Sequence, residues 1–182
     1  MTHARNRTSP AQGLLHRHFI DEMEDVLVGR LRAEARSDEC RTELMQKTGI
    51  SDDRLLSELA GLGLTSNSLV ALRLIPLVLV AWADKHVDDK EHAAVMGIAK
   101  ELGIRKDSDA YIMLEHWLRE IPPGVSLDAW KRYMYFVMQR MSRSAQQKLV
   151  RFFEKQMVEV AEASGGLLGS GKTSQKERQM ID

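Results

Sequence analysis

The chain has 182 residues, of which 43% are hydrophobic, 5% aromatic and 29% charged, and its 26 basic residues balance its 26 acidic ones. This length suits one ordinary domain with a substantial core. The balanced charge argues against nucleic acid or an anionic membrane surface as an obligatory partner, because either needs a broad basic face. The single cysteine, Cys40, excludes an intrachain disulfide framework and a CxxC metal site, and it favours the reducing cytoplasm.

Neither a secretory signal peptide nor a membrane-spanning helix is expected. The first 13 residues are polar and lack an apolar h-region, and we expect them to be disordered. The longest apolar run, from Leu69 to Ala83, carries Arg73 and Pro76 and is shorter than the ~20 residues that a spanning helix needs. We therefore expect no membrane insertion and interpret the apolar run as a buried helix.

An amphipathic helix is predicted from residue 15 to residue 31. Acidic residues lie between apolar residues that recur at roughly helical spacing, namely Leu15, Phe19, Met23, Val26, Val28 and Leu31. Such a helix can dock on its own domain, pair with a second copy to form a homodimer, or contact a protein partner. The expected organisation is a flexible N-terminal region over residues 1–37, which carries this helix, and a helical domain over residues 38–182.

Capped helices are predicted along the rest of the chain. One runs over residues 39–48 and is closed by Gly49, and the next is capped by Ser51. A third runs from about residue 66 to residue 83, with a kink or a restart at Pro76. Further helices are expected over residues 88–102, 107–121 and 126–141, and another is capped by Ser144.

No segment shows sustained strand alternation, so the predicted fold class is all-α. The spacing of Asp88 and Glu91 is that of a capping box at the start of a helix. Large aromatic residues on the apolar stripes of these helices are expected to anchor the core, and they are Trp82, Trp117, Trp130 and Phe153.

An internal repeat is visible in the sequence. Residues 80–91, VAWADKHVDDKE, align with VAEASG from residue 160 followed by KTSQKE, which ends at Glu177. In both segments a helix ending in Ala-x-Ala is followed by a turn and a capping-box pair, which predicts two pseudo-symmetric helix-turn-helix halves. The second segment also satisfies the P-loop expression at residues 166–173. It follows a predicted helix instead of a strand, so we interpret that match as accidental.

The chain resembles the TerB-like family, the helical modules named for tellurite resistance. The resemblance lies in VAWADKHVDDKE at residues 80–91 and AEASGGLLGSGKTSQKE at residues 161–177, and it extends over about residues 50–182. It implies a compact helical domain with pseudo-symmetric halves, an acidic cluster associated with divalent metal, and a role in stress response without a defined catalytic step. Two positions depart from the family pattern, because Lys85 stands where Gly is common and Ser164 where an Asp could stand.

Asp84, Asp88 and Glu91 are the candidate metal ligands. Their carboxylates are hard ligands suited to calcium, magnesium or manganese, and a turn between helices can bring them together. Asp84 lies where the preceding helix should end, a position at which the helix dipole disfavours a negative charge unless a cation meets it. The alternative is that Asp88 and Glu91 only cap a helix and that Lys85 pairs with Asp84.

Other candidate residues give weaker signals. His86 and His92 are expected on the surface, because they lie on different elements, and His116 at the edge of a helix face. No serine has a nucleophile-elbow context and Cys40 lies in no motif, so an enzyme is not expected. Two hypotheses remain. One is a non-catalytic TerB-like protein linked to stress response that binds a divalent metal, and the other is a helical interaction module without metal that recruits a partner through helix 15–31.

Overall fold

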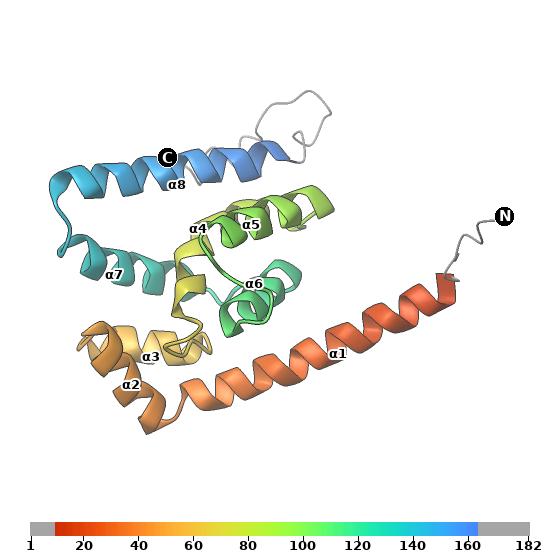
Figure 1. Ribbon diagram of the computed structural model, residues 1–182, viewed down its shortest axis with the longest axis horizontal. Coiled ribbons are helices and arrows are strands. Elements are labelled where there is room, and N and C mark those ends of the chain that lie inside the picture. The colour runs from red at the N-terminus through yellow and green to blue at the C-terminus, as the bar shows by residue number, and fades with distance from the viewer. Residues whose placement is uncertain (1–9, 164–182) are drawn as a thin grey trace, which may run out of the picture.

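The structure is a computed structural model that describes the backbone of residues 10–163 and the side chains of residues 22–163. Helices account for the regular structure in this range, and no strand occurs in it, which confirms the predicted all-α class (Figure 1). The helices are α1 Pro10–Ala35, α2 Asp38–Thr48, α3 Asp53–Gly61, the 3₁₀ helix η1 Leu69–Leu74, α4 Ile75–Ala81, α5 Asp89–Glu101, α6 Asp109–Arg119, α7 Ser126–Met138 and α8 Arg143–Ala163.

The central apolar run of the sequence forms the centre of the fold. η1 and α4 pack against α5, α6, α7 and α8 (Figure 1), and most of their side chains are buried. Pro76 lies in the first turn of α4 and has no N–H with which to bond the carbonyl of Leu72. That carbonyl accepts the N–H of Ile75 instead, as in a 3₁₀ turn. The predicted restart at Pro76 is therefore confirmed, and the proline explains why the preceding segment is 3₁₀.

Two helices begin with capping residues that differ from the predicted ones. Asp52, not Ser51, caps α3, and its Oδ1 accepts two backbone N–H bonds at 2.9 and 3.1 Å. Ser142, not Ser144, lies before α8, where its Oγ accepts one backbone N–H at 3.3 Å. In each case adjacent residues could all serve as caps, and the structure uses the one whose oxygen reaches the unpaired N–H groups of the first turn.

The C-terminal half of α1 belongs to the core. Its buried residues face α6 and α3 and are Val28, Leu31 and Ala35. The predicted boundary at residue 37 falls in the turn between α1 and α2, and the same core extends across it. α1 begins at Pro10, inside the stretch expected to be disordered. Met23 and Val26, also on α1, are 50% and 71% exposed.

The four aromatic residues expected in the core are buried to different degrees. Trp117 and Phe153 are 1% and 7% exposed, whereas Trp82 and Trp130 are half-buried and pack against the core from its edge. Trp130 meets Phe153 edge to face, with ring centroids 5.8 Å apart. The Nε1–H of Trp82 donates to the carbonyl oxygen of Trp117 at 2.7 Å. The prediction is therefore confirmed for Trp117 and Phe153 and only partly correct for the other two.

The second copy of the predicted repeat lies in residues 164–177, outside the described residues, as do the P-loop-like segment and Ser164. The helices that precede the two turns are α4 and α8, and they pack directly against each other. α4 ends at Ala81, two residues before the predicted end at Ala83. In residues 10–163, no helix combines the length and apolar character needed to cross a membrane.

Candidate functional site

The acidic turn between α4 and α5 holds the three predicted metal ligands. Asp88 caps α5, because its Oδ1 accepts the N–H groups of Lys90 and Glu91 at 2.8 and 2.9 Å. Glu91 returns a bond, since its Oε2 accepts the N–H of Asp88 at 2.9 Å. The predicted capping box is confirmed. Glu91 is only 3% exposed, whereas Asp84 is exposed. Two of the three carboxylates are thus engaged with the backbone, and metal binding here stays a prediction.

Lys85 has an unusual backbone conformation at this turn. Its φ is 72°, in the left-handed region that favours glycine. The N–H of Lys85 donates to the carbonyl oxygen of Trp82 at 2.9 Å and closes the turn. The backbone therefore adopts the conformation for which a glycine would be suited.

We expect Lys85→Gly to raise the free energy of unfolding by about 1 kcal/mol, because left-handed strain in a non-glycine residue costs more than the extra chain entropy of glycine. Chemical denaturation measures the change. The control is Lys100→Gly in α5, where the backbone is helical and glycine should lower stability by about 1 kcal/mol. A loss of stability at both positions would contradict the assignment of strain to Lys85.

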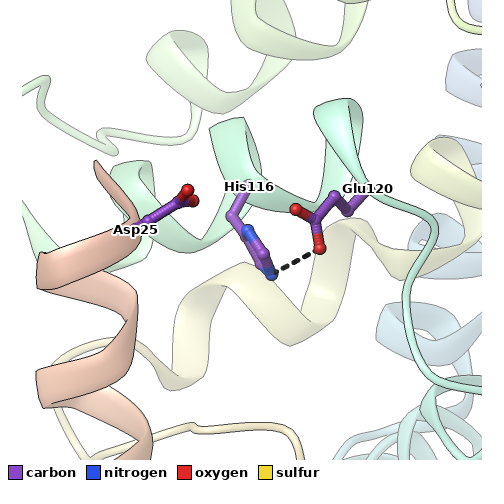
Figure 2. A group of neighbouring side chains, drawn as sticks. All are labelled: Asp25, His116 and Glu120. Carbon is purple, nitrogen blue, oxygen red and sulfur yellow. Dashed lines mark ion pairs between the residues drawn. The ribbon is translucent and has the colours of Figure 1, made fainter. Parts of the chain in front are cut away.

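A second group of ligating side chains lies between α1 and α6 (Figure 2). One oxygen each of Asp25 and Glu120 and one ring nitrogen of His116 all lie within 4.8 Å of one another. Asp25 is on α1, His116 is on α6, and Glu120 is the residue that caps the C-terminus of α6. Among the described side chains, no such convergence is found for the three predicted ligands of the acidic turn.

Two arginines take part in this α1–α6 cluster. The Nη2 of Arg32 lies 2.8 Å from the Nε2 of His116. Arg119 pairs with Glu24 at 3.2 Å and with Asp25. Because a guanidinium group only donates hydrogen bonds, Nε2 of His116 must accept, which places the ring proton on Nδ1. The cluster is therefore a charge network that holds α1 against α6.

His116 is buried, with 4% of its surface exposed, and does not lie at the edge of a helix face as predicted. Burial, and then the neighbouring charge of Arg32, lower the pKa of His116 below its ordinary value. The ring is therefore neutral near pH 7. Neutral imidazole is the form that binds metal ions.

His92 is also paired. Its Nε2 lies 2.6 Å from Oε2 of Glu115, and this pair joins α5 to α6. The hydrogen bond to Glu115 raises the pKa of His92. Burial acts to raise the pKa of Glu115, but hydrogen bonds from His92 and Tyr111 lower it overall. Burial and the bond to Glu115 raise the pKa of Tyr111 to about 12. Of the two histidines expected on the surface, His86 is exposed and His92 is only partly so.

Cys40 lies buried on α2. Burial raises the pKa of its thiol, and the negative charges of Glu34 and Glu43 raise it further. A thiol in this state is a poor nucleophile, because the thiolate is the reactive form.

The α1–α6 cluster was missed in the sequence. His116 and Glu120 are four residues apart, a spacing that places two side chains on one helix face and could have been noticed. Nothing local connects them to Asp25, whose ion-pair partner Arg119 is 94 residues away. An imidazole and two carboxylates form a donor set suited to Zn²⁺, Mn²⁺ or Fe²⁺. Comparison of the chain with protein-family models, with curated proteins and with solved structures found no match.

Proposed function

We propose that this protein is a non-catalytic, TerB-like helical protein of the stress response that binds a divalent cation. The resemblance at residues 80–91 supports the family, as does the left-handed backbone of Lys85 at the position of the family's Gly. The observation that carries cation binding is the convergence of Asp25, His116 and Glu120 within 4.8 Å. Their chemistry favours a transition metal, because imidazole is a poor ligand for calcium and magnesium.

The α1–α6 cluster supports this function better than the acidic turn does. At the turn, Asp88 and Glu91 accept backbone N–H bonds that a cation would have to disturb. In the cluster, packing holds the buried imidazole of His116, and the exposed carboxylates of Asp25 and Glu120 lie beside it and accept no backbone hydrogen bond within the described residues. A buried neutral imidazole also supplies a ligand that needs no deprotonation.

The arginines of the cluster compete with a cation. A metal ion that uses Nε2 of His116 must displace the guanidinium of Arg32, which lies 2.8 Å away. A metal ion that uses Asp25 must weaken its pairing with Arg119. We therefore expect moderate affinity, and we expect it to increase when Arg32 is replaced by glutamine.

Isothermal titration calorimetry with Zn²⁺, Mn²⁺ and Ca²⁺ tests the proposal. We expect Glu120→Gln to weaken Zn²⁺ or Mn²⁺ binding by a factor on the order of tenfold or more, since loss of a ligand should cost at least as much as loss of a supporting residue. Asp84→Asn is the matched control at the acidic turn and should leave binding unchanged. If Asp84→Asn weakens cation binding and Glu120→Gln does not, the cation binds at the acidic turn, through Asp84, Asp88 and Glu91.

An interaction module without metal is the second candidate. It is favoured by the exposed apolar side chains of Met23 and Val26 on α1. If titration of the wild-type protein with each of the three cations gives no heat of binding, cation binding is contradicted. The interaction module is then the remaining candidate function. The charges between α1 and α6 would then serve only to position α1.

A further inference from the structure

A hollow lies where the chain turns from α5 into α6. Its volume is about 370 Å³, a size typical of small-molecule sites. α5 is followed by the left-handed Gly103, and the N–H of the next residue, Ile104, donates to the carbonyl oxygen of Ala99 at 2.9 Å. This bond folds the chain back, and Ile104 is only 5% exposed. The apolar side chains that line the hollow are those of Met96, Ile104 and Tyr111.

The other side chains that line the hollow are basic, and they belong to Lys100, Arg105 and Lys106. All three residues are exposed. Arg105 is paired, since its Nε lies 3.2 Å from Oδ1 of Asp107, whereas neither lysine takes part in an ion pair within the described residues. Glu101 is the next residue after Lys100, but adjacent helical side chains point in different directions, and Glu101 does not line the hollow. The two lysines therefore make this hollow positively charged.

Glu115 acts on the hollow through two of its lining residues. Burial and the hydrogen bond to Glu115 raise the pKa of Tyr111 to about 12, so the phenol stays neutral and adds no negative charge. Burial opposes the charge of Glu115, but hydrogen bonds from His92 and Tyr111 and the charge of Lys106 lower its pKa overall. Glu115 thus offsets part of the charge of Lys106, and Lys100 supplies the larger share of the attraction for an anion.

We propose that this α5–α6 hollow binds a small organic carboxylate, a molecule with one negatively charged group on a compact apolar body. The apolar body contacts Met96, Ile104 and the ring of Tyr111, and its burial contributes most of the affinity. The carboxylate lies near Lys100 and Lys106, whose charges select an anion over a neutral ligand of the same shape. Methionine is flexible, so the hollow accommodates apolar bodies of different shapes. This inference goes beyond cation binding and does not rest on it.

Titration with octanoate tests the proposal, with nuclear magnetic resonance of the methionine and isoleucine methyl groups as the readout. Octanoate should shift the signals of Met96 and Ile104 with a dissociation constant on the order of 1 mM, as expected of a ligand with few non-hydrogen atoms. The matched probe 1-octanol lacks the charge and should bind more weakly, and acetate lacks the apolar body and should shift neither signal. About 0.5 M salt should weaken octanoate binding, because it screens the exposed lysines.

The double variant Lys100→Gln/Lys106→Gln should raise the dissociation constant for octanoate by about tenfold, or about threefold for each lysine, since a single exposed charge contributes little. Lys90→Gln/Lys131→Gln is the matched control. It removes the same charge from exposed lysines on α5 and α7 that do not line the hollow, and it should leave the dissociation constant unchanged. Met96→Gln removes apolar surface and should weaken octanoate and 1-octanol alike. Circular dichroism confirms that each variant remains folded.

Four results would overturn the proposal. If octanoate at about ten times the expected dissociation constant shifts no signal, the hollow binds no such anion. If 1-octanol binds as tightly as octanoate, or if the two double variants bind octanoate equally well, the lysines do not recognise the charge. Shifts confined to methionines of α7 and α8 would place the ligand elsewhere on the protein. No residue that lines the hollow belongs to the α1–α6 cluster, so the outcome is independent of the calorimetric test with cations.

Discussion

Replacing Trp117 by alanine is expected to lower the free energy of unfolding by about 3–5 kcal/mol. Its side chain is 1% exposed and is among the largest fully buried side chains in the described part of the chain. The loss combines the transfer free energy of the indole with the cavity that remains, since helices packed on all sides collapse only partly. Urea denaturation followed by circular dichroism measures the change.

Trp130→Ala is the matched comparison. Trp130 is half-buried at the edge of the core and contacts Phe153, so its truncation exposes a smaller cavity that solvent can fill. We expect a loss well below that of Trp117→Ala, in proportion to the smaller area removed from the core. Equal losses for the two variants would contradict the difference in burial.

Gly63→Ala is expected to lower the free energy of unfolding by about 2–4 kcal/mol. Gly63 follows α3 with a φ of +76°, which a residue with a Cβ adopts only with strain. A Cβ at this position would also lie 2.7 Å from Cγ of Arg32 and 3.5 Å from its Cα. The Cα lies at ordinary contact distance, so relief requires the side chain of Arg32 to rotate away, which would disturb its contact with His116. Chemical denaturation measures the combined cost.

Gly103→Ala separates the two contributions. Gly103 has a φ of +82° and no heavy atom within 4 Å of the added Cβ, so only the backbone cost of about 1 kcal/mol applies. The difference between the two losses in the free energy of unfolding measures the cost of the close approach of α1 to the end of α3. Equal costs would indicate that Arg32 moves aside freely, in which case its contact with His116 should also be lost.

The features of the fold that depend on local chemistry could be predicted from the sequence. The capping box of Asp88 and Glu91 needs only two residues at a fixed spacing, and the restart at Pro76 follows from its missing N–H. The choice of Asp52 over Ser51 as the cap of α3 could not be predicted from residue type, because both side chains are good caps. It depends on where the packed helix begins.

The candidate site was less accessible to sequence reasoning. The carboxylates around Asp84 were predicted as metal ligands because they lie within eight positions of the sequence. In the structure, Asp88 and Glu91 cap α5 instead. The α1–α6 cluster depends instead on how two distant helices pack. The burial of His116 could not be read from its neighbours, since it follows from the position of α1 and of Arg32.

The separation in sequence between α1 and α6 affects the order in which contacts can form during synthesis. Arg32 precedes His116 by 84 residues, and Asp25 precedes Arg119 by 94. At a translation rate of about 5–20 residues per second, α1 is complete roughly 4–19 seconds before its partners on α6 exist. α2 and α3, which also contact α1, are made much sooner. On the ribosome, the first stable neighbours of the apolar face of α1 are therefore α2 and α3, and the charge network with α6 forms only after them.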